Sequence, residues 1–215
     1  MKVTFTTLSD NVFIRFRRRR MDSFFATLAP SPESHVLDVG GTAQTWMSES
    51  KGHVQFPVTL LNIRNYEQVD SDRFTSVEGD ATNLPFADNA FDIAFSNSVI
   101  EHVGTWEKQQ LFAREVRRVA RNLWVQTPAR SFPLEAHLLA PYIQYLPKRA
   151  QHRIVRWTPR GILQPHVVHE IIDEVRLLTC REMGQLFPDC LILKERVLGL
   201  TKSYIAVRRR PEISS

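Results

Sequence analysis

Residues 36–42 read Val-Leu-Asp-Val-Gly-Gly-Thr, and this stretch decides the fold. Its first four residues are a β-rich run, the glycine pair predicts a tight turn, and residues 42–50 have the small and polar character of a helix start. Two adjacent glycines also let a ligand approach the backbone with no side chain in the way, although a plain tight turn is the alternative. The stretch predicts a strand, turn and helix unit with a binding site where the strand ends.

Further strands are predicted on apolar runs rather than on alternating patterns, at residues 58–63, 74–78, 91–96 and 123–126. Such runs are typical of parallel strands that are covered on both faces. Residues 106–120 predict an amphipathic helix, and runs 190–197 and 203–207 predict two closing strands that can pair antiparallel. We expect a Rossmann-like, doubly wound, mostly parallel seven-stranded α/β sheet with an antiparallel C-terminal hairpin.

The chain has 215 residues, enough for one well-buried core, so we expect a single domain. Residues 1–34 are expected to form an N-terminal helical segment. Residues 127–165 are rich in proline, histidine and aromatic residues, and we expect a helical lid or substrate-cap insertion there, after the fifth strand. Helical segments are also expected over 171–178 and 179–187.

The chain carries 28 Lys and Arg against 23 Asp and Glu, a net charge of +5, which leaves nucleic acid or a lipid headgroup open as a partner. Two cysteines do not make a disulfide framework. The first ten residues contain no apolar stretch of signal-peptide length, and no run approaches the roughly 18 apolar residues of a membrane span. We therefore expect a cytoplasmic protein.

Residues 79–82, Gly-Asp-Ala-Thr, follow the third predicted strand. A carboxylate there can accept a hydrogen bond from an exocyclic amine while a backbone amide donates to a ring nitrogen, which is how an adenine edge is read. A turn residue or helix cap is the alternative for Asp80. The residues after the glycine pair lack the G-x-G-x-x-G pattern, which weakens a nicotinamide dinucleotide as the ligand.

Residues 84–103 read Leu-Pro-Phe-Ala-Asp-Asn-Ala-Phe-Asp-Ile-Ala-Phe-Ser-Asn-Ser-Val-Ile-Glu-His-Val. With the glycine turn and residues 79–81, this stretch resembles the class I S-adenosylmethionine-dependent methyltransferases, in the type 11 branch related to quinone-biosynthesis methyltransferases. The resemblance covers residues 35–126. It implies methyl transfer from S-adenosylmethionine to a small-molecule or lipid-linked acceptor, with oxygen as the favoured acceptor atom. An RNA methyltransferase and a non-catalytic cofactor-binding scaffold are the alternatives.

The resemblance also implies which residues hold the cofactor. The glycine turn would surround its methionine part, Asp80 and Ala81 would read the adenine, and residues 96–98 would line the inner wall. The family usually has Asp or Glu at the end of the second strand to grip the ribose hydroxyls, whereas this chain has Asn62, with Ile63 next to it. The full set is Asp38, Gly40, Gly41, Thr42, Asn62, Ile63, Asp80, Ala81, Ser96, Asn97 and Ser98.

Methyl transfer from a sulfonium is an in-line displacement, so the protein has to orient the nucleophile and remove its proton where needed. His102 resembles the histidine close to the transferring methyl in some members of the family, and helix capping or packing is its alternative role. Glu135 and His137 follow the fifth strand, where either could act as base or substrate anchor. We predict no metal site, because two ligands without a third nearby carboxylate or histidine do not define one.

Two surface features leave the partner open. The first is the basic run of Arg15 and residues 17–20, which is either a solvated helix face or a nucleic-acid contact. Nucleic acid is not favoured, because the chain lacks an Asn-Pro-Pro-Tyr motif and a nucleophilic cysteine for base methylation. The second is residues 138–149, where apolar and aromatic residues lead into Lys148 and Arg149. This segment predicts either a peripheral membrane contact or a lid packed on its own domain.

Overall fold

The computed structural model describes residues 4–64, 72–135 and 137–211. Seven strands form one sheet in the order β3-β2-β1-β4-β5-β9-β8. Strand β9 pairs antiparallel with β5 and with β8, and all other neighbouring strands pair parallel. The predicted Rossmann-like sheet with a C-terminal hairpin is confirmed. The strands are β1 Val36–Val39, β2 Val58–Asn62, β3 Phe74–Glu78, β4 Phe91–Asn97, β5 Ala120–Pro128, β8 Leu191–Val197 and β9 Leu200–Arg208.

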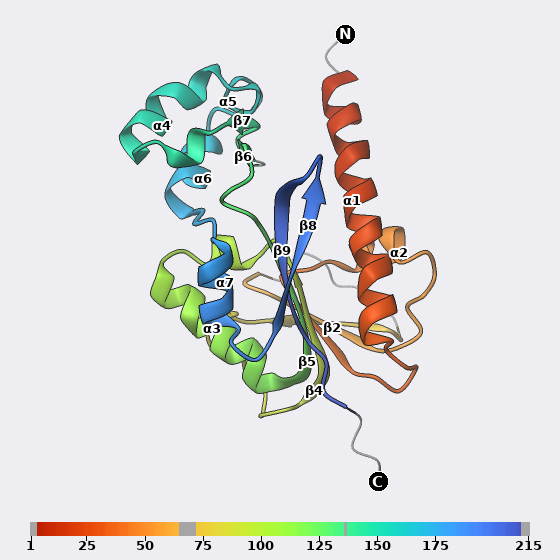
Figure 1. Cartoon of the computed structure of the whole chain (residues 1–215). Coiled ribbons are helices and arrows are strands. Elements are labelled where there is room, and N and C mark those ends of the chain that lie inside the picture. The colour runs from red at the N-terminus through yellow and green to blue at the C-terminus, as the bar shows by residue number, and fades with distance from the viewer. Residues whose placement is uncertain (1–3, 65–71, 136, 212–215) are drawn as a thin grey trace.

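Helices cover both faces of this sheet. Helices α1 (Thr4–Leu28) and α2 (Ala43–Glu49) lie on one side, and α3 (Trp106–Val119) and α7 (Cys180–Leu186) lie on the other (Figure 1). Neighbouring residues of β5 point to opposite faces, so Trp124 joins the core under α1 and α2 while Leu123 and Val125 join the core under α3 and α7. The apolar strand runs therefore arise from burial on both faces.

The connection from β3 to β4, residues 79–90, contains no helix. A single bridge between Asp80 and Asn83 closes a turn there. A doubly wound sheet commonly has a helix at such a crossover. Its absence in this described segment leaves the carboxyl end of β3 covered only by a short loop.

The cap begins after β5. Its elements are β6 Leu134–Glu135, β7 Ala140–Pro141, η2 Ile143–Tyr145, α4 Lys148–Ile154, η3 Val155–Trp157, α5 Pro159–Leu163 and α6 Val168–Glu174. They have a small core of their own, in which Val168 and Ile172 of α6 pack with Ile143 and Val155. The cap therefore extends past residue 165, the boundary expected from composition, because α6 supplies part of its core. It stands beyond one end of the sheet, the end toward which the N-terminal part of α1 also extends (Figure 1).

The segment predicted as a helix over 171–178 ends at residue 174. Beyond it the backbone is held by the sheet side of the molecule, since Arg176 N donates to Glu101 O and Leu178 bridges Ala129. Helix α7 then starts at a capping box in which Thr179 and Glu182 bond each other's backbone N–H groups. These contacts tie the cap to the sheet at both of its ends.

Candidate functional site

A cavity of about 430 Å³ opens at the carboxyl ends of β1, β2 and β3. This is the edge at which ligands bind in doubly wound sheets. Of the residues expected to hold a cofactor, six line it: Gly40, Asn62, Ile63, Asp80, Ala81 and Ser98. Its other walls include Val99 and His102. We call it the cofactor cavity.

The glycine pair shapes the floor of this cavity. Gly40 has a φ of +82°, and a Cβ on it would fall 2.5 Å from a methyl carbon of Val99. A Cβ on Gly41 would fall 1.7 Å from Oδ2 of Asp38. Neither position has room for a side chain, so the turn brings bare backbone to the cavity. Gly41 itself lies behind the lining, and Thr42 caps α2 by accepting a hydrogen bond from Thr45 N.

Asp38 lies under this turn and is 2% exposed. Its Oδ2 accepts a hydrogen bond of 2.6 Å from Trp46 Nε1, while its buried Oδ1 has no partner among the described residues. Burial raises the pKa of Asp38 from 3.8 to about 7, against the smaller opposing effect of the Trp46 bond. A buried carboxylate oxygen without a donor is costly, and a cationic ligand group above the turn would relieve that cost.

Asn62 and Asp80 each use part of their side chain within the protein. Asn62 Nδ2 donates to Gly41 O at 2.9 Å, so the amide holds the turn in place. A carboxylate could not make this bond, which gives a physical reason for Asn in place of the usual Asp or Glu. Asp80 Oδ1 accepts 2.8 Å bonds from Thr82 N and Thr82 Oγ1, which is the turn role considered above. One oxygen of each side chain is left for a ligand.

The three residues that end β4 have different places. Ser96 is buried and donates to Val39 O, which ties β4 to β1. Asn97 Oδ1 accepts from Arg20 Nη1 at 2.5 Å. Ser98, with a φ of +60°, is the one of the three that lines the cofactor cavity. Its hydroxyl donates to Gln126 Oε1 at 3.0 Å.

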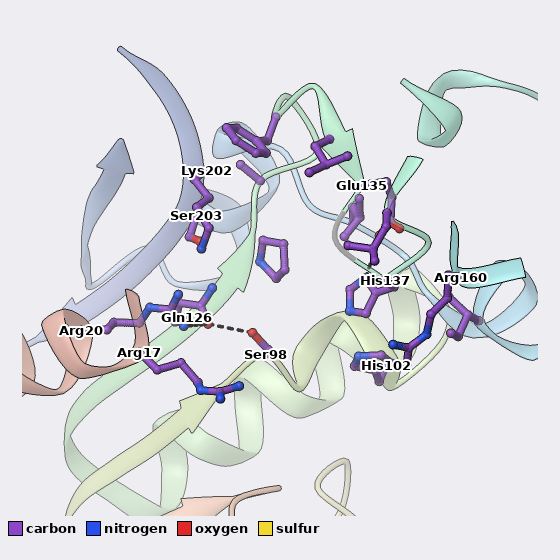
Figure 2. Close-up of a pocket in the computed structure, with 17 residues that line it drawn as sticks. Arg17, Arg20, Ser98, His102, Gln126, Glu135, His137, Arg160, Lys202 and Ser203 are labelled. Carbon is purple, nitrogen blue, oxygen red and sulfur yellow. Dashed lines mark hydrogen bonds and ion pairs between the residues drawn. The ribbon is translucent and has the colours of Figure 1, made fainter. Parts of the chain in front are cut away.

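A second cavity, of about 460 Å³, lies between α1, the end of β5 and the cap (Figure 2). Ser98 and His102 line both cavities, so the two meet at these side chains. Glu135 and His137 line the second cavity from the cap side. We call it the acceptor cavity. The structure thus brings the three predicted catalytic residues to one place, at the junction of the two cavities.

Glu135 and His137 form a bonded pair. His137 Nδ1 lies 2.7 Å from Glu135 Oε1, and Glu135 Oε2 accepts a bond from Leu138 N. Burial lowers the pKa of His137, but the bond to Glu135 and its negative charge outweigh burial and leave the pKa raised. Glu135 is 5% exposed, so its charge is poorly screened. The pair gives His137 the character of a base.

His102 differs from His137 in its charge state. The two rings contact edge to face, with centroids 4.8 Å apart. Burial lowers the pKa of His102 to about 4, helped by the neighbouring His137 and opposed by Glu135. His102 is therefore neutral at pH 7. It lies in the short helix η1 (Ile100–His102) directly after β4.

Sequence reasoning missed Glu101, which is fully buried beside these histidines. Thr127 Oγ1 donates to its Oε2, whereas Oε1 has no partner among the described residues, and burial raises its pKa. Ligand atoms of Glu101, His102 and His137 lie within 4.8 Å of one another. We predicted no metal site because the sequence offered no third ligand group nearby. The structure places Glu101 there as a possible third ligand. The sequence signal for this residue was its position next to His102. Because glutamate is rarely fully buried, its burial was not predicted.

The fold and the site agree with the resemblance found in the sequence. A glycine turn with no phosphate-binding loop, and a carboxyl beneath it, are compatible with the class I methyltransferases that the sequence resembles. A family model for a methyltransferase domain matches residues 53–122. Residues 53–122 are thus similar to a methyltransferase domain, which agrees with the resemblance found in the sequence.

Comparison with individual proteins agrees with this class. A protein named as a methyltransferase in Encephalitozoon cuniculi is 29% identical over 106 residues, which are 49% of this chain and 46% of that protein. The chain thus matches about half the length of this curated relative. A solved S-adenosylmethionine-dependent methyltransferase from Aquifex aeolicus has a TM-score of 0.50 at 14% identity over 87% of both chains.

A solved structure from Rhodobacter sphaeroides, named as a zinc-dependent alcohol dehydrogenase, has a TM-score of 0.62 at 14% identity over 90% of both chains. At such identities these structures show the shared fold alone. No helix in the described part of the chain is long and apolar enough to cross a membrane.

Proposed function

We propose that this chain transfers a methyl group from S-adenosylmethionine to an oxygen of a small-molecule or lipid-linked acceptor. The observation that carries the proposal is the junction of the two cavities. Ser98 and His102 border both, and the Glu135–His137 pair faces the acceptor side. A hydroxyl bound there would lie between a base and the methyl donor, as an in-line displacement requires.

The residues present fit the cofactor. When bound, S-adenosylmethionine supplies a methyl group on a sulfonium centre that is already a good leaving group. In our proposal Asp38, Gly40, Gly41 and Thr42 form the methionine end of its site, where the unpartnered Asp38 oxygen suits an ammonium. The oxygens left free on Asn62 and Asp80, with Ile63 and Ala81 beside them, receive the ribose and adenine. Ser98 forms the wall toward the acceptor, with Ser96 and Asn97 supporting it from behind.

His137 is the base in this proposal. Its Nδ1–H donates to Glu135, which leaves Nε2 as the acceptor for the proton of the substrate hydroxyl. Nε2 would take the proton of the hydroxyl as its oxygen accepts the methyl group, with S-adenosylhomocysteine as the leaving group. Glu135 stabilises the resulting imidazolium. Neutral His102 orients the hydroxyl at the junction.

The test is methyl transfer from labelled S-adenosylmethionine to a panel of hydroxylated compounds, with the methylated atom assigned by NMR. His137→Asn should lower turnover by about 10²- to 10⁴-fold and leave affinity for S-adenosylhomocysteine unchanged. His169→Asn, on the exposed side of the cap, is the matched control and should keep full turnover. Methylation at nitrogen or carbon, or full turnover by His137→Asn, would refute the proposal.

The cap surface supports a lipid-linked acceptor and a peripheral membrane contact by a cytoplasmic protein. Trp157 and Ile162 are 74% and 68% exposed, and Arg149, Arg153 and Arg156 are exposed on the same group of helices. Exposed aromatic and aliphatic side chains beside basic ones suit the interface of an anionic membrane. Trp157→Gln should weaken co-sedimentation with phosphatidylglycerol vesicles. Leu198→Gln, which removes a 97% exposed leucine at the β8–β9 turn, should not.

The other two functions remain outcomes of these tests. Strong, salt-dependent affinity for RNA would favour an RNA methyltransferase. Cofactor binding without turnover on any acceptor would favour a non-catalytic scaffold. The basic run presents fewer arginines for RNA binding than its composition indicates, because Arg17 and Arg20 line the acceptor cavity.

A further inference from the structure

The acceptor cavity has a cationic end that the proposed mechanism leaves without a role. Arg17 and Arg20 of α1 line it together with Lys202 of β9. Figure 2 shows these three side chains on one side of the cavity and His102 and His137 on the opposite side. These three cations and His137 thus lie at different ends of one cavity, whereas Arg160, a fourth cation that lines it, lies beside the histidines (Figure 2).

Three positive charges at this end share two carboxylates, and neither carboxylate lines the cavity. Arg20 Nη2 and Lys202 Nζ lie 3.2 and 3.6 Å from the same oxygen, Oε2 of Glu195. Arg17 Nε lies 2.6 Å from Glu49 Oε1. One positive charge is left without a counter-charge. The Lys202 ammonium has three N–H donors and one carboxylate partner, so donors remain for a ligand.

The surplus positive charge is energetically costly because two of the three side chains are buried. The side chains of Arg20 and Lys202 are 6% and 14% exposed, and Arg20 Nε has no hydrogen-bond partner among the described residues. Burial lowers the pKa of Lys202, against the opposing effect of Glu195. Lys202 is also held over the ring of Phe16, with Nζ 4.3 Å from its centroid. Buried cations without full compensation are costly, and a bound anion would supply the missing charge.

We infer that Arg17, Arg20 and Lys202 form a binding site for a carboxylate. Much of the rest of the cavity wall is apolar, while the hydrogen-bonded Ser98 and Gln126 lie between Arg20 and His102 (Figure 2). The apolar lining residues are Pro128, Ala129, Phe132, Leu134, Leu139, Ile171 and Leu177. Resting on the proposed function, the acceptor is a hydroxy acid with an apolar body. Its hydroxyl lies at His137 and its carboxylate at Lys202. The second source of a carboxylate is the methionine part of the cofactor, and the experiment separates the two.

The experiment measures binding by calorimetry in two sets of ligands, and in each set one member of a pair lacks the carboxylate of the other; 5′-methylthioadenosine lacks the ammonium as well. The first set is 4-hydroxybenzoate and 3-(4-hydroxyphenyl)propanoate, each compared with its own carboxamide in the presence of saturating S-adenosylhomocysteine. The second set is S-adenosylhomocysteine compared with 5′-methylthioadenosine. Lys202→Met removes the charge at similar size, and Lys202→Gln is a second variant should the first not fold. Arg19→Gln is the matched control, because it removes one exposed charge next to Arg20 without touching the cavity.

We expect the acids to bind more tightly than their amides to the wild type, and Lys202→Met to weaken the acids alone by on the order of tenfold or more. That result assigns the site to the acceptor. A loss confined to S-adenosylhomocysteine, with 5′-methylthioadenosine unaffected, supports the site and assigns it to the cofactor. Equal effects on both members of each pair, or the same losses in Arg19→Gln, would overturn the inference. Failure of the wild type to bind S-adenosylhomocysteine would instead count against the proposed function.

Discussion

The buried carboxyl of Asp38 predicts that cofactor affinity depends on pH. Because its pKa is raised to about 7, Asp38 is largely protonated below that pH in the ligand-free protein. The proposed partner is an ammonium, which needs the carboxylate form. Binding must then release a proton, and each pH unit below 7 should weaken S-adenosylhomocysteine binding up to about tenfold. Between pH 7 and pH 5 the loss is about 50-fold, because half of Asp38 is already protonated at pH 7.

The assay is calorimetric titration at pH 5, 6, 7 and 8 in two buffers of different ionisation enthalpy, which counts the protons released. Asp38→Asn keeps an acceptor for Trp46 Nε1 and removes the titration, so its affinity should be lower above pH 7 and independent of pH. The control ligand is 5′-methylthioadenosine, which lacks the ammonium. Nearby His137 titrates on the acceptor side, and His137→Asn separates its contribution. An affinity of the wild type that does not change with pH would refute the role of Asp38.

The same carboxyl fixes the sign of a stability effect. Its pKa is raised on folding, so protonated Asp38 favours the folded state. This contribution is complete below about pH 4 and is lost as the pH rises through about 7. Without cofactor, the wild type should therefore lose more stability than Asp38→Asn between pH 5 and pH 8. Denaturant unfolding of the two proteins at both pH values measures the difference.

Three further predictions concern the two cavities. Asn62→Asp restores the residue type usual in the family, but it places a carboxylate against Gly41 O, so thermal unfolding should show destabilisation by about 1–3 kcal/mol and calorimetry no gain in cofactor affinity. The methylation rate should fall as the pH drops through the raised pKa of His137, because only its neutral form accepts a proton; a rate that rises there would exclude it as the base. Treatment with EDTA should leave the rate unchanged, whereas a loss restored by Mn²⁺ would make Glu101, His102 and His137 metal ligands in place of a base mechanism.

The cofactor cavity could be predicted from the sequence because its parts are local. In a parallel sheet the residues after each strand meet at one edge, so Gly40, Asn62 and Asp80 converge without any long-range packing decision. The individual roles were harder to predict. Ser96 and Ser98 belong to the same short motif, but Ser96 is buried because both faces of the sheet are covered at β4, and the left-handed backbone at Ser98 turns it to the cavity.

The extent of the cap was not predictable from composition. The proline and aromatic enrichment ends near residue 165, but α6 contributes Val168 and Ile172 to the core of the cap. Which apolar residues share a small core depends on tertiary packing, and composition does not register it. Glu101 was missed for a related reason: its burial depends on tertiary packing beside the neighbouring strand β5, where Thr127 donates to it.

The cationic end of the acceptor cavity joins residues from opposite ends of the chain. Lys202 arrives there because β9 runs antiparallel to β5, with Ser203 opposite Pro128 at the end of β5. Helix α1 is fixed by Phe24, whose ring contacts the rings of Trp46, Phe95 and Trp124.

Helical spacing then divides the basic run. Arg20 and Arg17 precede Phe24 by four and seven residues and lie on its face, whereas Arg15, Arg18 and Arg19 face solvent. The periodicity of Phe24 and Leu28 with Arg17 was thus a signal in the sequence. This signal alone does not predict a substrate site, because Lys202 reaches the two arginines only through the register of β9, which no local pattern predicts.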